Sequence, residues 1–282
     1  MKLDKSINLT TSVKYERGQY MAYVMKTTKA GNRIVVEKYY TSRYGSKGKC
    51  TRSQNYGSTP ENMAVRNARY AYQKADDIFN ENFHQGDLTM TLTFAKDKRP
   101  KNTKEMLKIW ERYIRQVRTA YKKAGVLLKW QKGIDPTESN PHIHIALTSI
   151  DIKLLPKWEY GGVHIRPVED RDNHTFGSYA KKQGTIDEEN PKEFLPGKSL
   201  CCYTHSRNCV IPEPDITIIS NDHWSEEPRA PKGWYIFEKH IENWEDEVNG
   251  YKHQRYILCK LPDKKVKSKT KRNSAAGNRR RL

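Results

Sequence analysis

The sequence lacks any long apolar segment, and this absence excludes whole classes of protein. No stretch of the 282 residues approaches the roughly 20 consecutive apolar positions that a membrane-spanning helix needs. Residues 1–5 include two lysines and an aspartate and do not lead into the apolar core of a secretory signal peptide. Cysteine is also scarce, and the five cysteines of the chain indicate no disulfide framework. We therefore expect a soluble protein of the reducing cytoplasm.

Acidic residues are few relative to basic ones. The chain has 33 Asp and Glu against 52 Lys and Arg, which gives a formal net charge of +19. Such a field favours polyanionic partners, nucleic acid before an anionic membrane. The segment 264–282 holds nine Lys or Arg and no acid, and it predicts a disordered tail that contacts phosphates without regard to base sequence. The rest of the chain is basic in its own right.

Hydrophobic periodicity predicts an α+β fold with a central antiparallel sheet. Strands are expected at 19–26 and 33–40, around a turn at Gly31-Asn32. Residues 88–94 alternate strictly between apolar and polar, which is typical of a half-buried strand. Further strands are expected at 126–131, 142–148, 163–168, 234–239 and 255–258.

Helix signals stand between these strands. Thr59-Pro60 predicts a helix start, with Thr as the N-cap and Pro in the first position. Asn102 and Glu105 resemble a capping box before an apolar stripe that ends at Gly125. A short helix is expected at 175–183. The order of strands and helices predicts one antiparallel sheet with helices on one face.

The chain is expected to divide into four regions. Residues 1–85 form an N-terminal β-hairpin and helix, and residues 86–200 form the main α+β core. Residues 201–262 are expected to be a C-terminal extension that packs on this core, and residues 263–282 are the basic tail.

His142-Ile143-His144 is the most informative motif. Alternate residues of a strand face the same way, so His142 and His144 are expected to project together, with Ile143 on the opposite face. Two imidazoles on one strand face form a pair of metal ligands. Unrelated β-folds use the same spacing, and two surface histidines beside a sheet core would also produce it. The motif alone therefore names no reaction.

A third metal ligand is expected near this pair. Gln131 ends the preceding predicted strand, and its amide oxygen faces the histidines if the strands pair as a hairpin. Asp135 and Glu138, in the predicted loop between the strands, are the alternatives. Each of the three could instead be a solvated polar group, and of the three Gln131 is favoured as the ligand.

Tyr179 and Lys182 form the second chemical feature. In a helix they lie one turn apart on the same side, where an ammonium group favours attack by the tyrosine as a phenolate. With 17 tyrosines in the chain, this spacing alone is also compatible with a buried Tyr and a surface Lys. Four further residues have the side-chain types of a zinc site, although buried free cysteines explain them as well: Cys201, Cys202, His205 and Cys209.

Together these motifs resemble the HUH endonuclease superfamily, and within it the rolling-circle replication initiators of phages and plasmids. The strand 88–94 resembles the first motif of that family, 142–147 its two-histidine motif and 179–182 its nucleophile motif. Residues 158–163 resemble a lead-in strand of phage members. The resemblance covers roughly residues 86–184.

The resemblance implies an HUH-type palm and a metal-assisted transesterification. His142, His144 and Gln131 would hold Mg²⁺ or Mn²⁺, and Tyr179 would become joined to the 5′ end of single-stranded origin DNA, assisted by Lys182. The released 3′-OH would prime the polymerase of a bacterial host. The chain contains no P-loop motif, so a host helicase would unwind the DNA.

Two departures from the family pattern accompany this resemblance. Gln131 stands where the family often has a Glu ligand, and the nucleophile helix has one tyrosine where relaxases carry two. Three alternatives remain: a transposase or relaxase of the same superfamily, a non-enzymatic nucleic-acid-binding protein, and a metal-dependent β-fold enzyme for small molecules. The positive charge argues against the last.

Overall fold

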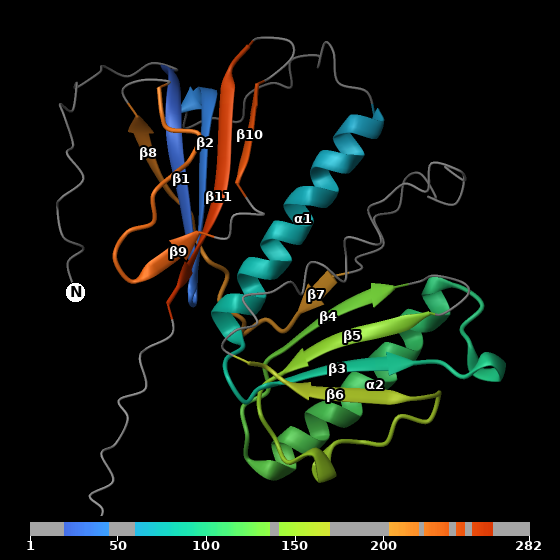
Figure 1. Ribbon diagram of the computed structural model, residues 1–282. Coiled ribbons are helices and arrows are strands. Elements are labelled where there is room, and N and C mark those ends of the chain that lie inside the picture. The colour runs from blue at the N-terminus through green and yellow to red at the C-terminus, as the bar shows by residue number, and fades with distance from the viewer. Residues whose placement is uncertain are drawn as a thin grey trace, which may run out of the picture.

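The computed structural model describes residues 20–44, 60–135, 141–169, 203–219, 223–236, 241–245 and 250–261. These residues form two antiparallel sheets and two α-helices (Figure 1). The mixed α+β class is therefore as predicted, but the expectation of one sheet was wrong. None of the described helices is long and apolar enough to cross a membrane.

The first sheet has six strands in the order β10-β11-β2-β1-β8, with β9 also paired to β11. Its strands are β1 (Tyr20–Ala30), β2 (Arg33–Tyr44), β8 (Asp215–Ile219), β9 (Trp234–Ile236), β10 (Glu242–Glu245) and β11 (Lys252–Lys260). The predicted N-terminal hairpin thus forms a sheet with strands from the segment expected to be a C-terminal extension. This pairing joins residues that are far apart in the sequence, such as Val24 and Ile218.

Gly31 is required at the turn between β1 and β2. Its φ angle of 53° lies in the left-handed region, and an added Cβ would approach the Asn80 carbonyl oxygen to 2.2 Å. Its backbone N–H donates to Glu81 Oε2 at 2.8 Å. The predicted Gly31-Asn32 turn is confirmed, and the helix that follows packs directly on it.

The second sheet has five strands in the order β6-β3-β5-β4-β7. They are β3 (Leu88–Thr93), β4 (Trp130–Asp135), β5 (His142–Leu147), β6 (Val163–Pro167) and β7 (Tyr203–His205). Two short 3₁₀ helices, η1 (Lys96–Lys98) and η2 (Ile152–Leu154), lie in its connections. The segment 201–262 therefore contributes one strand to this sheet and the remaining strands to the other.

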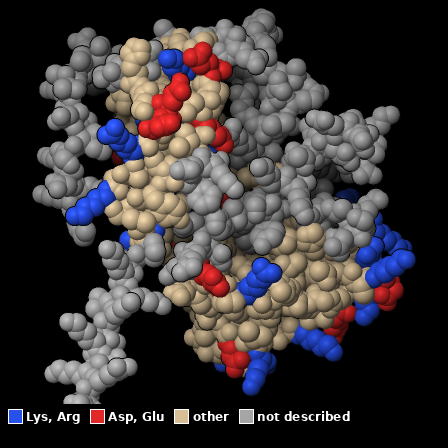
Figure 2. Space-filling model, viewed as in Figure 1, with Lys and Arg blue, Asp and Glu red and all other residues tan. Residues whose placement is uncertain are grey.

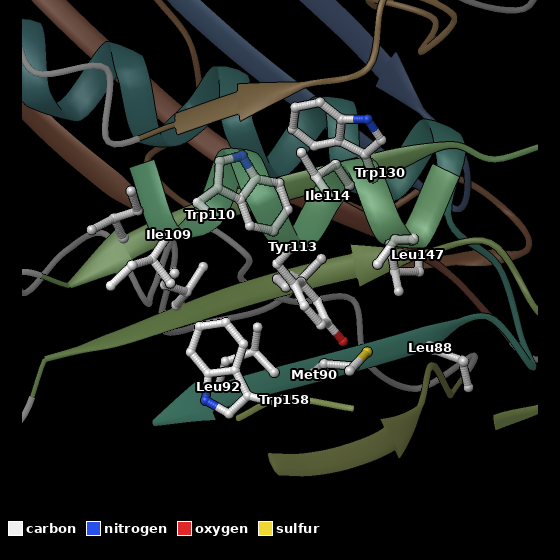
Figure 3. Packing of buried hydrophobic residues seen from close by; sticks show 14 of the residues in the cluster. Leu88, Met90, Leu92, Ile109, Trp110, Tyr113, Ile114, Trp130, Leu147 and Trp158 are labelled. Atoms are coloured by element: carbon white, nitrogen blue, oxygen red, sulfur yellow. The ribbon is translucent and has the colours of Figure 1, made fainter. Parts of the chain in front are cut away.

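Helix α2 (Thr103–Ala124) covers one face of the five-stranded sheet. Its N-cap Asn102 accepts a hydrogen bond from the Glu105 backbone N–H, and Gly125 ends it with a φ of 67°, as the sequence predicted. The apolar residues of β3 alternate inward; Tyr113 packs against Trp158, and Trp110 packs against Trp130 of β4 (Figure 3). This apolar layer is the main core of the protein.

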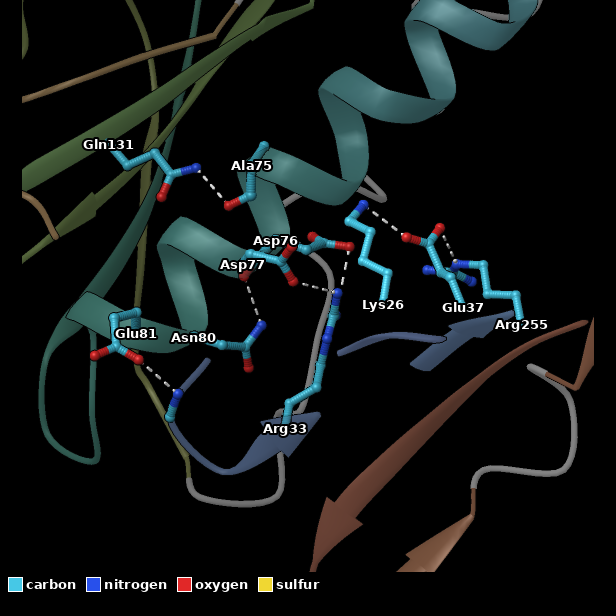
Figure 4. Close-up of polar contacts among 11 residues, drawn as sticks. Lys26, Arg33, Glu37, Ala75, Asp76, Asp77, Asn80, Glu81, Gln131 and Arg255 are labelled. Atoms are coloured by element: carbon cyan, nitrogen blue, oxygen red, sulfur yellow. Dashed lines mark hydrogen bonds and ion pairs between the residues drawn. The ribbon is translucent and has the colours of Figure 1, made fainter. Parts of the chain in front are cut away.

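Helix α1 (Pro60–Asn82) contacts both sheets (Figures 1 and 4). Toward the first sheet, Asp77 Oδ1 accepts from Arg33 Nη2 at 3.1 Å. Toward the second, the Ala75 carbonyl accepts from Gln131 Nε2 at 2.8 Å, and Phe79 and Phe83 pack with Ala146. Ala146 faces away from α2, so the two helices contact opposite faces of this sheet, and the expectation of helices on one face was wrong.

Two strand boundaries also differ from the predictions. The strand expected at 126–131 begins at Trp130, because Val126 and Leu127 are exposed and Gly125 has just ended α2. The segment 158–162 forms no strand: Trp158 is buried in the core, and Gly161 lies against the Thr93 backbone. The predicted helix 175–183 lies outside the described residues.

The Asp77–Arg33 pair gives the joint between α1 and the first sheet a pH dependence. Burial raises the pKa of Asp77 from 3.8 to about 6, despite the attraction of Arg33. The pKa is higher in the folded state than in the unfolded chain. The corresponding stabilisation is therefore complete below the unfolded pKa and is lost as the pH rises through the folded pKa.

We expect wild-type protein to lose about 2 kcal/mol of unfolding free energy, relative to Asp77→Asn, between about pH 4.5 and about pH 7.5. Urea denaturation at the two pH values measures this difference. Asp97→Asn removes an exposed carboxyl from η1 and serves as the control. Parallel pH dependences for wild type and Asp77→Asn would contradict the assignment.

Candidate functional site

The central strand of the five-stranded sheet carries the two-histidine motif. In β5, Ile143 and Ile145 are almost fully buried against the α2 layer, while His142 and His144 lie on the opposite face. The two imidazole centroids are 4.6 Å apart, with the rings nearly perpendicular. The expectation that both histidines project together is confirmed.

Thr91 of β3 contacts His144. Thr91 and His144 are directly paired across the sheet, and Thr91 Oγ1 lies 3.1 Å from His144 Nδ1. If Nδ1 carries the proton and donates to this hydroxyl, Nε2 is the nitrogen with a lone pair for a metal. Such a contact fixes the tautomer and the ring orientation of a ligating histidine.

The register of the sheet places small residues beside the pair. His144 is opposite Thr91 on one side and Gly133 on the other, and His142 is opposite Thr93 and Asp135. Gly133 has no side chain to contact the His144 ring from β4. His144 is 7% exposed and His142 is half-buried, so the accessible end of the pair lies at His142.

Gln131 lies on the same face as the histidines. It is the second residue of β4, not the last residue of a strand as expected, and it pairs with Ala146. Its position is therefore diagonal to His144, within reach of a long side chain. Asp135, expected in a loop, is the last residue of β4 and pairs with His142, while Glu138 lies outside the described residues.

The side-chain amide of Gln131 has a hydrogen-bond partner at its nitrogen but not at its oxygen within the described residues. The side chain is 1% exposed, and its Nε2 donates to the Ala75 carbonyl. Its Oε1 is buried and, within the described residues, has no hydrogen-bond partner. The bond to Ala75 fixes which end of the amide is the oxygen, so a neutral hard acceptor remains on the histidine face.

These residues fit a divalent metal of modest affinity. The donor set is two imidazoles and one amide oxygen, and within the described ranges no three His, Cys, Asp or Glu residues cluster as a metal site. A metal held here would complete its coordination with water or with phosphate oxygens, which are the ligands that Mg²⁺ and Mn²⁺ prefer.

His164 and Arg166 of β6 are site residues that the sequence reasoning missed. They pair with Thr91 and Thr89, and so they share the histidine face of the sheet. Both are exposed, and Arg166 Nε donates to His164 Nε2 at 2.7 Å. The alternation of Val163-His164-Ile165-Arg166 could have indicated this face, because Ile165 packs on the core.

The remaining candidate residues are not brought together by the described structure. Tyr179, Lys182, Cys201 and Cys202 lie outside the described residues. Nδ1 of His205, in β7, lies 3.0 Å from the Ser206 carbonyl oxygen. Cys209 is buried, with its thiol near Ser206 Oγ and the Trp130 carbonyl. The described part of the chain holds no group of three His, Cys, Asp or Glu residues that could bind zinc.

Comparisons with protein-family models, with curated proteins and with solved structures found no match to this chain.

The Thr91 contact can be tested through metal affinity. Thr91→Val keeps the shape of the side chain but removes the hydroxyl beside His144, and we expect Mn²⁺ affinity to fall about 10-fold. Thr89→Val, on the same face of β3, removes a hydroxyl that bonds to the Arg166 carbonyl, and it is the matched control. Calorimetric titration measures both. Equal affinities in the two variants would argue against the contact with His144.

Gln131→Glu tests the amide oxygen. Without metal, the carboxylate would face the Ala75 carbonyl in a buried position, and we expect a loss of about 1–3 kcal/mol in unfolding free energy. If this side chain is a ligand, Mn²⁺ binds more tightly than to wild type and restores the stability. A purely structural Gln131 would give a destabilised variant that Mn²⁺ does not rescue. Denaturant unfolding with and without Mn²⁺ separates these outcomes.

Proposed function

We propose that this protein is a metal-dependent endonuclease of the HUH type that nicks and rejoins single-stranded DNA to start rolling-circle replication. The observation that supports it most strongly is the pair of histidines on the central strand of an antiparallel sheet. Their rings lie side by side, and His144 is oriented by Thr91. A sheet core alone requires apolar residues on the α2 face and gives no reason for paired imidazoles on the other.

His142, His144 and Gln131 are the residues that would hold Mg²⁺ or Mn²⁺. When bound, such an ion polarises a phosphate and stabilises negative charge on the oxygen that leaves. The Thr91 contact keeps the His144 ring in place, and the Ala75 contact keeps the amide oxygen of Gln131 turned toward the histidine face. The protein thus contributes a site whose ligands are positioned before substrate arrives.

Tyr179 is the proposed nucleophile. Its hydroxyl oxygen forms a bond to phosphorus, and the bond from phosphorus to the 3′ oxygen of the preceding nucleotide breaks. The proton of the tyrosine is lost, and the departing 3′ oxygen gains one. The products are a 5′-phosphotyrosine and a free 3′-OH, and the reverse reaction rejoins the strand without a nucleotide cofactor. Lys182 would stabilise the phenolate or the charge on the phosphate.

The charge of the chain supports a nucleic-acid substrate. Lys and Arg side chains gather at one edge of the unit built on the five-stranded sheet, with fewer acidic side chains among them (Figure 2). This face of the sheet would present its metal ligands to one phosphate of an unpaired strand from the His142 side, the more accessible end of the pair. Single-stranded DNA, including the loop of an origin hairpin, is therefore the expected substrate. The free 3′-OH would prime host polymerase, with unwinding by a host helicase.

The decisive observation would be a covalent protein–DNA adduct. We expect Mn²⁺ and a labelled pool of single-stranded and hairpin DNA to give an adduct that persists on a denaturing gel. Tyr179→Phe should abolish it, because the substitution removes only the attacking oxygen. His142→Ala and His144→Ala should each reduce it at least 100-fold while DNA binding persists.

Tyr160→Phe, at a partly buried tyrosine on the α2 side of the sheet, is the matched control and should leave the adduct unchanged. An adduct that survives Tyr179→Phe would overturn the nucleophile assignment. DNA binding without any adduct would instead favour a non-enzymatic nucleic-acid-binding protein. A transposase or relaxase of the same superfamily would share the adduct but differ in the DNA ends that it selects.

A further inference from the structure

His164 and Arg166 form a side-chain unit on the edge strand β6. Arg166 Nε donates to His164 Nε2 at 2.7 Å, so the imidazole is an acceptor at this nitrogen and the positive charge belongs to the guanidinium. In the part of the chain that the structure describes, no partner occupies the two terminal nitrogens of Arg166. The arginine is thus held at one end and has its terminal N–H groups available at the other.

This unit lies level with the histidine pair. His164 pairs with Thr91, and Thr91 pairs with His144, so the three residues form one row across β6, β3 and β5. Adjacent strands are about 4.8 Å apart, which places His164 about 10 Å from His144 along the sheet. His164 Nε2 already accepts from Arg166 Nε, so this nitrogen is not available to a metal shared with the pair.

Threonine side chains of β3 lie between the two groups. Thr89, Thr91 and Thr93 are the β3 residues on this face, and the hydroxyls of Thr89 and Thr93 donate to the β6 carbonyl of Arg166 and the adjoining carbonyl of Gly162. Because threonines are the β3 residues between the histidines and Arg166, a nucleic-acid backbone that crosses β3 would reach both groups. The charged N–H donors of Arg166, at the far side of β3 from the histidines, suit a phosphate.

We propose that Arg166, positioned by His164, binds a backbone phosphate of the single-stranded DNA next to the phosphate held at the histidine pair. This subsite rests on the proposed function, because it takes the histidine face as the place where DNA is bound. A guanidinium offers two parallel N–H donors to phosphate oxygens, and an arginine already held at Nε loses less conformational entropy on binding. Such a contact contributes affinity without reading base sequence.

The salt dependence of binding to oligothymidine tests the subsite. Each phosphate contact to a single strand adds about 0.7 to the slope of log affinity against log salt concentration. Arg166→Gln should therefore lower the slope by about 0.7 and weaken binding about 10-fold. Arg112→Gln removes the same charge from an exposed position on α2, the helix that covers the other face, and should leave the slope unchanged.

His164 is a positioning residue and has a separate readout. His164→Ala keeps the arginine charge but frees its side chain, so we expect about threefold weaker binding with the slope largely retained. His164→Gln supplies an amide oxygen for the same Nε–H and should restore affinity. If both variants weaken binding equally, His164 does not position Arg166.

The outcomes separate this subsite from the proposed reaction. Mn²⁺ affinity should be unchanged in Arg166→Gln, because the guanidinium is not a metal ligand. If Arg166→Gln and Arg112→Gln give the same slope while wild type forms the adduct, the phosphate subsite is wrong and the reaction stands. If no adduct forms but Arg166→Gln alone lowers the slope, the subsite stands and the reaction is wrong.

Discussion

The alternation of side chains along β5 is the constraint on which both the core and the candidate site depend. Ile143 and Ile145 are buried against α2, and this burial fixes which face of the strand His142 and His144 occupy. A slip of one residue in register would place both histidines in the apolar core and the isoleucines on the polar face. The hydrophobic layer therefore determines the position of the imidazoles as strictly as their own contacts do.

Helix α1 connects this site to the rest of the molecule. Its Ala75 carbonyl accepts a hydrogen bond from the Gln131 amide and so orients it. Two residues further along the helix, Asp77 accepts a hydrogen bond from Arg33 of the first sheet (Figure 4). The first sheet is completed on both sides of the β1–β2 hairpin by strands from the C-terminal part of the chain, which pair with β1 and β2. The orientation of one proposed ligand therefore depends on a helix that both sheets hold in place.

Much of the local structure could be predicted from the sequence, because its causes are local. Alternation predicted β3, capping residues predicted both ends of α2, and Gly31-Asn32 predicted the hairpin turn. The division into two sheets could not be predicted, since the pairing of β11 with β2 joins distant segments. For the same reason only part of the site could be predicted. The shared face of the two histidines follows from the strand period, whereas sheet register is what places Thr91 and Arg166 on that face.

The proposed function requires that the paired histidines bind a divalent metal on the face of the five-stranded sheet opposite α2. Anomalous diffraction from crystals containing Mn²⁺ tests it most directly, because it locates the ion without reference to activity. We expect an anomalous peak within bonding distance of one imidazole nitrogen of each of His142 and His144, with Gln131 Oε1 as the nearest amide oxygen. Fully occupied Mn²⁺ elsewhere, with none between these two rings, would contradict it.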